Sequence, residues 1–356
     1  MPDTTAPAAP AGSDAPMRAV VYDAPRSLGV REVPRPVAAP GEVVVDVDLA
    51  GVCGTDLHLH EGGFFASFPL TPGHESTGTV RSVGAGVAHL RPGQRVVVDN
   101  ASACGRCPEC SRGDHLFCEQ FLSLGVNAPG GFAESLLSPA HKVYPADDLP
   151  PEVAVLAEPL ACAVHGMDAL GLRPGADVLV VGAGTTGLLL AQLLLHGGAG
   201  RVTVAAPTPF KLELAEAYGV DRVVRVTRDA AETARTLAAL QPGGFDVTVD
   251  VTGVAPVVAT LPDLTATNGT VFVYGMCDED ARIPLSPYDV FRRQLTVKGS
   301  FAQVDCMDRS LALLRSGRVR TEGLVTHRFG LDEYPLALET LRSDPTSLKV
   351  LVEPGR

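Results

Sequence analysis

The chain has 356 residues, 46% of them hydrophobic and 20% charged, and its formal net charge at pH 7 is -12. That length exceeds what one hydrophobic core usually fills, so two globular domains are expected, and the composition excludes a disordered or fibrous chain. The acidic balance argues against a nucleic acid or an anionic membrane as partner, and no stretch approaches the roughly 20 apolar residues of a membrane span.

The N-terminal segment, residues 1–16, is predicted to form a flexible tail. It consists mainly of Ala, Pro, Thr, Gly, Ser and Asp, and it lacks the cationic and apolar regions of a signal peptide. We therefore expect a cytoplasmic protein. In that reducing compartment the eight cysteines are expected to be metal ligands or free thiols, and not disulfides.

Between Met17 and about Tyr144 the sequence predicts an all-β region with long loops. Short alternating apolar runs are broken there by Gly and Pro, at residues 18–22, 42–49, 77–83 and 95–98. Two of the loops, about twenty residues apart, carry Cys53 and the pair His74-Glu75. These are soft, borderline and hard metal ligands, although each residue alone is more often a core or surface residue.

Four cysteines, Cys104, Cys107, Cys110 and Cys118, lie within one 15-residue loop rich in Gly, Pro and Arg. Zinc is bound tetrahedrally by four close thiolates, and Cys-x-x-Cys spacing lets a turn direct successive sulfurs inward. The loop therefore predicts a closed structural zinc site. The alternative, a pair of disulfides, is opposed by a reducing compartment.

From about Pro150 the pattern changes to alternating strands and helices. A helical pattern at 164–170 precedes an apolar run at 177–181, a glycine-rich turn and a second helical pattern at 188–195. Later apolar runs lie at 201–205, 245–251, 270–274 and 295–298, with helix-like segments between them. This order predicts a parallel sheet covered by helices on both faces.

The glycine-rich turn indicates a dinucleotide site. Gly182, Gly184 and Gly187 follow a predicted strand and open a helix, with Thr185 and Thr186 between them. In that context the glycines permit a tight turn and close backbone approach, so that the helix N-terminus binds the pyrophosphate. The alternative is a turn with a purely structural role.

Cofactor preference is expected to depend on the residues after the second strand of this unit. An NAD enzyme places an acid there, but none occurs from residue 201 to 212, and Ala206 occupies the expected position. Thr208 and Lys211 are candidate contacts for a 2′-phosphate, and Arg225 and Arg228 are candidates near the adenine end. The sequence therefore favours NADP(H) over NAD(H).

Taken together, these motifs resemble the zinc-dependent medium-chain dehydrogenases, and most closely their polyol and sorbitol branch. The resemblance covers Met17 to the C-terminus and rests on the order and spacing of Cys53-Gly-Thr-Asp, Pro72-Gly-His-Glu, the cysteine loop, Glu158-Pro-Leu-Ala-Cys and Gly182-Ala-Gly-Thr-Thr-Gly. It implies an α/β plus β fold: a GroES-like β-rich catalytic domain at 17–160, a Rossmann doubly wound parallel-sheet cofactor domain at 161–299, and a C-terminal return to the catalytic domain at 300–356.

The resemblance also implies roles for individual residues. Cys53, His74 and either Glu75 or Glu158 hold the catalytic zinc, and Asp56 either orients a ligand or caps a helix. Thr55 takes the substrate proton, and His58 passes it to solvent. Gly253, Tyr274 and Lys349 lie along the cofactor. Because a thiolate and two carboxylates outweigh the charge of Zn²⁺ by one unit, we further expect one glutamate to be an exchangeable ligand.

The expected activity is the interconversion of an alcohol and its ketone or aldehyde by hydride transfer, with one catalytic and one structural zinc and NAD(P)(H). Phe64, Phe65, Phe68 and Phe121 are expected to line an apolar substrate pocket, which would disfavour simple polyols, or else to pack loops. The alternatives are an NADPH-dependent reductase of C=C or C=N bonds and a non-enzymatic NADPH- or zinc-binding protein. Edge strands of the parallel sheet predict a homodimer or homotetramer.

Overall fold

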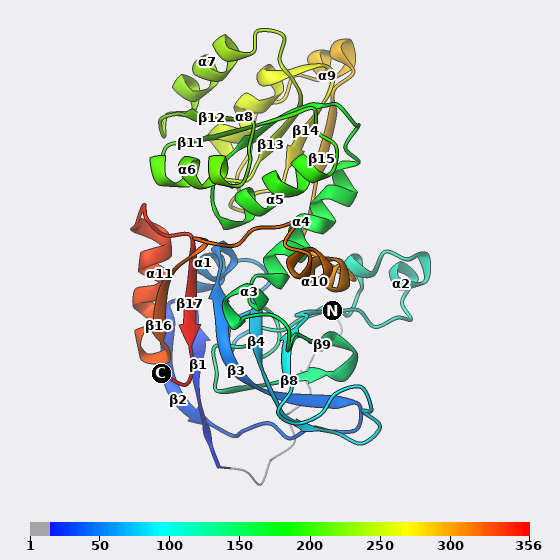
Figure 1. Cartoon of the computed structure of the whole chain (residues 1–356), viewed down its shortest axis with the longest axis vertical. Helices are drawn as coiled ribbons and strands as arrows, with labels where there is room; N and C mark the ends of the chain where they lie inside the picture. Colours follow the sequence, from blue (N-terminus) through cyan, green and yellow to red (C-terminus); the bar gives the residue numbers. More distant parts are fainter. Residues whose placement is uncertain (1–14) are drawn as a thin grey trace. The chain divides into compact units, whose positions relative to one another are not determined.

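The computed structural model describes residues 15–356 and divides the chain into two compact units (Figure 1). The first unit contains the chain up to Glu158 together with residues 327–344 and 349–356, and the second contains residues 159–326 and 345–348. Residues 1–14, most of the expected tail, lie outside the described residues.

A seven-stranded sheet forms the centre of the first unit, in the order β16-β17-β3-β4-β5-β9, with β8 paired to β3. Its strands are β3 (Glu42–Val52), β4 (Glu75–Val83), β5 (Arg95–Val98), β8 (Ser135–Pro139), β9 (Val143–Pro145), β16 (Val325–Gly330) and β17 (Lys349–Glu353). Two-stranded sheets are formed by β1 (Met17–Ala24) with β2 (Ser27–Val33), and by β6 (Ala101–Ser102) with β7 (Leu122–Ser123). The α-helices of this unit are α1 (Gly54–Glu61), α2 (Pro108–Arg112), α3 (Pro151–Ala154) and α11 (Tyr334–Ser343).

The length and apolar pattern of β3 explain its central place in this sheet. Val43, Val45 and Val47 are buried and pack in one cluster with Val350 of β17 and with Tyr334 of α11. Because β3 pairs with β4, β8 and β17, the residues that follow it are surrounded by segments from distant parts of the sequence.

The second unit contains a six-stranded sheet in the order β12-β11-β10-β13-β14-β15, and all its pairings are parallel. In chain order this is 3-2-1-4-5-6, the doubly wound arrangement, so the predicted fold class is confirmed. The strands are β10 (Asp177–Val181), β11 (Arg201–Ala206), β12 (Arg222–Arg225), β13 (Phe245–Asp250), β14 (Thr265–Val273) and β15 (Thr296–Gly299). The helices are α4 (Ala157–Leu170), α5 (Thr185–His196), α6 (Pro209–Ala217), α7 (Ala230–Leu240), α8 (Ala255–Leu264), α9 (Pro287–Arg293) and α10 (Met307–Arg315).

The C-terminal return starts later than the sequence led us to expect. Residues 300–326 belong to the second unit, and the first unit resumes at His327 instead of residue 300. The reason is that this segment binds to helices of the second unit. Arg309 donates two hydrogen bonds to the carboxylate of Asp168. Gln192 donates a hydrogen bond to the backbone carbonyl of Arg320 and accepts one from its backbone amide.

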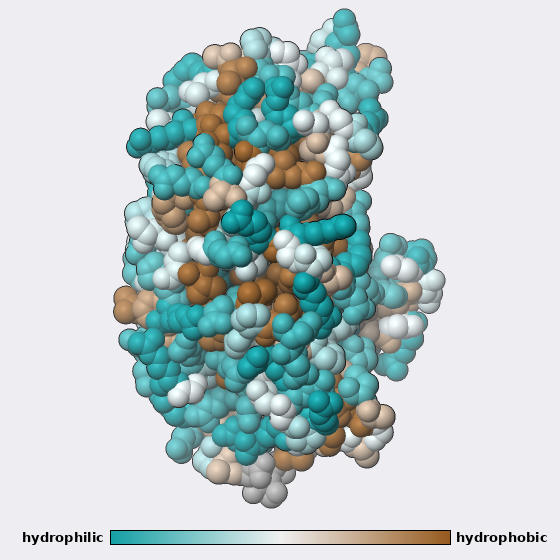
Figure 2. Space-filling view, viewed as in Figure 1, coloured by the Kyte–Doolittle hydropathy of each residue, from teal (hydrophilic) through white to brown (hydrophobic). Residues whose placement is uncertain are grey.

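One helical stretch, Pro151–Leu170, is long and apolar enough to cross a membrane by length and composition. The expectation that no stretch approaches a membrane span is therefore wrong for this segment. However, 67% of its most apolar window is buried inside the protein, which is typical of a core helix, so the stretch is weak evidence for a membrane span. On the face drawn in Figure 2, hydrophilic side chains predominate and apolar ones show in small patches.

Candidate active site

The three candidate ligands of the catalytic metal lie at the ends of two neighbouring strands. Cys53 directly follows β3, and His74 directly precedes β4. These strands are antiparallel, with Gly51 opposite Glu75. The ligand atoms of Cys53, His74 and Glu75 all lie within 4.8 Å of one another. A thiolate, an imidazole and a carboxylate with a fourth position open fit a catalytic zinc ion.

Gly51 is required by the position of the Glu75 carboxylate. A Cβ atom at residue 51 would lie 1.9 Å from Oε2 of Glu75, far closer than atoms can approach. The carboxylate therefore lies against the backbone of β3, where only glycine leaves space for it.

Asp56 caps α1, while its role in orienting the ligand His74 stays a prediction. Its Oδ2 accepts a hydrogen bond of 2.8 Å from the Cys53 amide and so forms part of the capping box of α1, while its Oδ1 lies 3.9 Å from Nδ1 of His74. Burial raises the pKa of Asp56 to about 6, although the charge of His74 opposes this. A carboxylate behind one imidazole nitrogen directs the other toward a metal ion.

The charge on His74 also depends on its neighbours. Burial lowers its pKa, but the hydrogen bond with Cys53 and the charge of Asp56 outweigh burial and raise the pKa to about 10. A histidine must be neutral to ligate, so metal binding at this site is coupled to proton release.

Lys349 lies beside the metal ligands, whereas we expected it along the cofactor. Strand β17 pairs with β3, with Val350 opposite Val52, and this places Nζ of Lys349 at 2.6 Å from both oxygens of Glu75. The side chains are 4% and 0% exposed. Burial lowers the pKa of Lys349, but the charges of Glu75 and Cys53 outweigh it and raise the pKa above its ordinary value.

Glu158 lies close to this site without joining the ligand trio. It is 6% exposed in the first turn of α4, and its charge contributes to the raised pKa of both His74 and Lys349. Between the two glutamates named by the resemblance, Glu75 is therefore the one within ligand distance of both Cys53 and His74.

The two residues expected to move the substrate proton share one side of α1. Oγ1 of Thr55 lies 3.8 Å from Sγ of Cys53, and His58 follows three residues later, so both side chains point to the same side of the helix. Both are partly exposed. Their roles stay predictions.

Three of the four aromatic residues that were expected to line the substrate pocket pack against apolar neighbours in the first unit. Phe121 packs against the cysteine loop, while Phe64 and Phe68 pack against the buried side chains of Leu59, Leu70 and Val126. Phe65 is 49% exposed, and its ring centroid lies 4.5 Å from that of Phe64. Loop packing, the alternative left open by the sequence, therefore accounts for three of the four.

The cysteine loop brings its four sulfurs together. All four ligand atoms lie within 4.8 Å of one another, and backbone amides point at two of them, with Cys104 N at 3.2 Å from Cys118 Sγ and Cys110 N at 3.5 Å from Cys107 Sγ. The backbone amide of Arg106 is the main reason that the pKa of Cys104 is lowered to about 6. Amide-stabilised thiolates in a closed group fit a structural zinc ion.

In the second unit, the three glycines of the motif differ in their surroundings. Gly182 has φ +115°, and a Cβ atom at Gly182 or Gly187 would lie 2.8 Å from Cγ2 of Val251. The packing around both positions therefore leaves space only for glycine. A Cβ at Gly184 would meet open space. Gly184 begins α5, and among the described residues no side chain caps this helix end. Its amides are therefore available to a pyrophosphate.

The end of β11 lies beside an exposed arginine of the adjacent strand. Ala206 is 2% exposed and lies in register with Arg225 of the adjacent strand β12, whose side chain is exposed. Thr208 begins α6, and Nζ of Lys211 lies 5.8 Å from the ring centre of Phe210. Arg225 thus lies directly beside Ala206, the position on which cofactor preference was expected to depend.

Sequence reasoning missed Asp250, which shapes the end of β13. Its carboxylate accepts hydrogen bonds from the amides of Thr252 and Gly253 and from the Thr252 hydroxyl, and its carbonyl accepts from the amides of Tyr274 and Gly275. It therefore ties together the two loops for which a cofactor role was expected. Its position at the carboxyl end of a central parallel strand was a usable signal.

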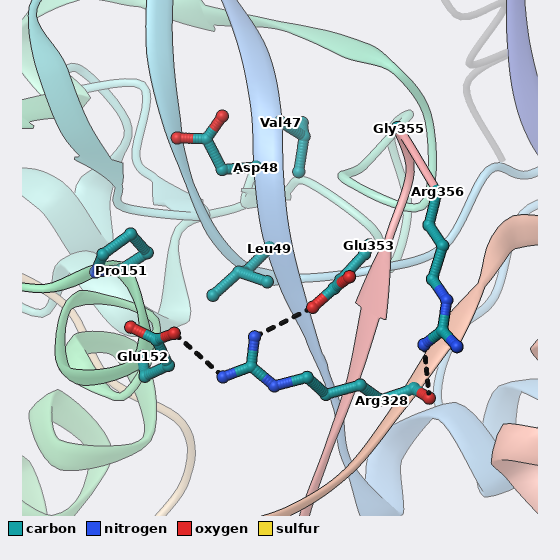
Figure 3. A pocket seen from close by; sticks show the side chains of 9 residues that line it. All are labelled: Val47, Asp48, Leu49, Pro151, Glu152, Arg328, Glu353, Gly355 and Arg356. Carbon is teal, nitrogen blue, oxygen red and sulfur yellow. Dashed lines mark hydrogen bonds and ion pairs between the residues drawn. The ribbon is translucent and has the colours of Figure 1, made fainter.

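A cavity of about 390 Å³ lies elsewhere in the first unit (Figure 3). Arg328 lies within it and forms ion pairs of 2.9 Å with Glu152 and Glu353. The guanidinium is thus already neutralised, and the cavity is not the expected substrate site. The residues that line this cavity are Val47, Asp48, Leu49, Pro151, Glu152, Arg328, Glu353, Gly355 and Arg356.

A β-rich unit with a zinc-type ligand trio and a doubly wound unit with a dinucleotide-binding turn define a zinc-dependent nicotinamide oxidoreductase. Residues 39–148 match the model of the alcohol dehydrogenase GroES-like domain, and residues 185–316 match that of the zinc-binding dehydrogenases. The chain belongs to the zinc-dependent medium-chain family of alcohol and polyol dehydrogenases.

Individual relatives support this membership over nearly the whole chain. D-arabinitol dehydrogenase 1 of Uromyces fabae is 43% identical, over 95% of this chain and 97% of that protein. D-altritol 5-dehydrogenase of Agrobacterium fabrum is 36% identical, over 90% and 94%. The crystal structure of a putative zinc-binding dehydrogenase from Sinorhizobium meliloti bound to NADP superposes with a TM-score of 0.88 at 33% identity, covering 96% of this chain and 100% of that one.

The protein is therefore an enzyme that interconverts an alcohol and its carbonyl counterpart by hydride transfer, using zinc and a nicotinamide cofactor. Its substrate is a small molecule. Relatives that are named dehydrogenases of D-arabinitol and D-altritol disfavour the two alternatives, a reductase of C=C or C=N bonds and a protein without enzymatic activity.

Proposed function

We propose that the substrate is an acyclic polyol, oxidised at a secondary hydroxyl with NADP as the acceptor. The observation that carries this proposal is the trio Cys53, His74 and Glu75, whose ligand atoms lie within 4.8 Å of one another. Two relatives with high identity are named for the sugar alcohols D-arabinitol and D-altritol. Phe64 and Phe68 pack against one apolar cluster and Phe121 against another, which weakens the reason to disfavour polyols.

The chemistry is divided between the bound groups and the chain's own residues. When bound, zinc supplies a Lewis acid for the substrate oxygen, and the nicotinamide supplies the hydride acceptor. Thr55 is proposed to accept the proton of the substrate hydroxyl and His58 to pass it to solvent. Asp56 holds His74 in the orientation that ligation requires.

Glu75 is proposed to be the exchangeable ligand. Lys349 offers its carboxylate a second partner at 2.6 Å, so Glu75 can leave the metal without becoming an unpaired buried charge. Cys53 and His74 are proposed to remain bound. Glu158 is proposed to act through its charge.

Steady-state assays with several alcohols test the substrate proposal. We expect D-arabinitol and related pentitols and hexitols to exceed 2-butanol in kcat/KM by about tenfold or more, because a site built to bond several hydroxyls leaves its polar groups unpaired with a simple alcohol. Removal of zinc by a chelator should abolish turnover of both. Equal or faster turnover of 2-butanol would overturn the polyol assignment.

Cofactor preference is proposed to depend on Arg225. Replacing it with alanine should lower kcat/KM for NADP about tenfold to a hundredfold, since a charge-assisted hydrogen bond contributes about 1.5–3 kcal/mol, and should leave NAD turnover unchanged. Arg222→Ala is the matched control, because Arg222 lies at the other end of β12, opposite Thr203. Equal losses with both cofactors, or a tenfold NAD preference in the unmodified enzyme, would contradict this proposal.

We propose two zinc ions per chain, one at the trio and one in the cysteine loop. The donor sets support both: the trio leaves a coordination position open, and the four thiolates close theirs. A reducing, cytoplasmic location belongs to the same proposal, since the four sulfurs bind zinc only while they are reduced.

We propose that the enzyme is a homodimer or homotetramer in which β15 meets a second copy. This strand ends the parallel sheet, and Val297 on it is 47% exposed. In the neighbouring helix α9, Tyr288 and Phe291 are 69% and 78% exposed and lie three residues apart, on one side of the helix. A free strand edge beside exposed aromatic side chains is a surface that a second subunit can cover.

Light scattering tests the oligomer. Phe291→Lys should reduce the measured mass to that of the 37.1 kDa chain, because a charge in an apolar contact disfavours association. The matched control is Phe117→Lys. Phe117 lies in the cysteine loop and is 66% exposed, and this change should leave the oligomer intact. An unmodified protein that is monomeric at micromolar concentration would rule the proposal out.

A further inference from the structure

Three buried polar atoms near the metal ligands have no hydrogen-bond partner within residues 15–356. They are Nδ1 of the ligand His74, Oδ1 of Asp56 and the hydroxyl of Tyr334. Asp56 and Tyr334 are both 0% exposed. A buried polar group without a partner costs about 1–3 kcal/mol, so native proteins normally satisfy such groups, often with an ordered water.

The packing of two helices brings the last two of these atoms into the same region. Asp56 lies in the first turn of α1 and Tyr334 is the first residue of α11, and the two helices pack against each other (Figure 1). Near their other ends Glu61 and Arg342 form an ion pair of 3.1 Å. The pKa of Tyr334 is raised mainly by burial and next by the charge of Asp56.

Tyr334 packs against Tyr22, which in turn contacts the partly exposed His60. The ring of Tyr22 meets that of Tyr334 edge-on, with centroids 6.3 Å apart and an interplanar angle of 86°. The hydroxyl of Tyr22, a residue 1% exposed, lies 2.9 Å from Nδ1 of His60, which is partly exposed in the last turn of α1. Tyr22, which packs against Tyr334, is thus bonded to the last turn of α1, the helix whose first turn contains Asp56.

We propose that one buried water molecule bridges Oδ1 of Asp56 and the hydroxyl of Tyr334, and that Tyr334 is thereby a positioning residue for the metal ligand His74. Tyr334 donates a hydrogen bond to the water, and the water donates one to Asp56. The inference rests on the zinc site proposed above.

The need for this water follows from how Asp56 is held. Its Oδ2 is occupied by the Cys53 amide, and its Oδ1 is too far from His74, at 3.9 Å, for a direct hydrogen bond. A donor on Oδ1 stops the carboxylate from rotating and keeps it directed at the imidazole. Partners of this kind, outside the ligands themselves, change metal affinity or activity by about 10–100-fold when they are removed.

The test is the change Tyr334→Phe, which removes one oxygen atom and preserves the ring packing. We expect the zinc at Cys53 to be lost to a chelator about tenfold faster, the visible spectrum of the cobalt-substituted enzyme to shift, and kcat to fall more than KM changes. Tyr22→Phe should act in the same direction but less strongly. The matched control is Tyr218→Phe, whose buried hydroxyl donates to the Glu322 carbonyl at 2.7 Å in the other unit; it should alter stability alone.

The outcomes separate this inference from the function on which it rests. If the unmodified enzyme holds two zinc ions and Tyr334→Phe retains them like the control, the positioning role is overturned and the zinc site stands. If the unmodified enzyme holds zinc only in the cysteine loop, the zinc site is overturned together with the role of Tyr334. If Tyr334→Phe does not fold, faster zinc loss from Tyr22→Phe supports the inference and unchanged zinc retention overturns it.

Discussion

Cys53→Ser is expected to lower kcat/KM about 1000-fold or more. The hydroxyl of serine is a much poorer zinc ligand than a thiolate, and loss of the Lewis acid removes several kcal/mol of transition-state stabilisation, about 4 kcal/mol corresponding to this factor. Elemental analysis should find that zinc falls from two ions per chain to one, because the four cysteines of the loop are untouched.

The control for Cys53→Ser is Cys306→Ser. Cys306 is another buried cysteine, whose sulfur lies 3.3 Å from the Val304 carbonyl, and a serine hydroxyl can keep that contact. This change should leave both zinc ions and turnover intact. Full activity in Cys53→Ser, or the loss of both zinc ions, would show that the trio is not the catalytic metal site.

Lys349→Met is expected to destabilise the metal-free enzyme by about 3–5 kcal/mol. The change leaves the Glu75 carboxylate, which is 0% exposed, without its cation, and an unpaired buried charge costs this much. Zinc should recover most of the loss, because the bound metal ion supplies the positive charge that the change has removed from Glu75. Chemical unfolding with and without zinc measures both free energies.

The double variant Lys349→Met with Glu75→Gln isolates the ion pair. With both charges removed, the metal-free protein should recover most of the lost stability, even though zinc binding is weakened. A double variant less stable than Lys349→Met would mean that Lys349 acts by packing and not by charge.

The same ion pair gives a pH dependence with a definite sign. The pKa of Lys349 in the folded protein lies above its ordinary value of 10.5, so the stabilisation is complete below about pH 10.5 and disappears as the pH rises through the folded-state pKa. The metal-free unmodified enzyme should therefore lose stability in strong alkali more steeply than Lys349→Met. Parallel stability profiles for the two proteins would contradict the pairing.

The features predicted correctly from sequence depend on short segments. The four cysteines fall within one loop, and Gly182, Gly184 and Gly187 fall within one turn, so their spacing alone determines which atoms can meet. The alternation of strands and helices likewise identified the doubly wound sheet. The spacing of Cys53 and His74 alone does not show that they meet, because they meet only when β3 pairs with β4. For these two residues the prediction came from the resemblance to a family.

What the sequence did not reveal depends on contacts between distant segments. The pairing of Lys349 with Glu75 requires that β17 lie beside β3, and no local pattern specifies that neighbour. The proximity of Tyr334 to Asp56 depends in the same way on α11 packing against α1. For Phe121, the type of residue suggested a substrate contact, but the cysteine loop offered nearer apolar surface and the ring packs there.

The order of synthesis gives the position of β17 a further consequence. The ribosome makes Lys349 274 residues after Glu75. A growing chain thus contains every donor of the trio long before the lysine exists, and in that interval a captured metal ion can supply the positive charge that Lys349 later contributes to Glu75. Early metal capture would therefore help the nascent polypeptide, whereas a protein truncated near its terminus would keep its ligands and lose the charge that balances them.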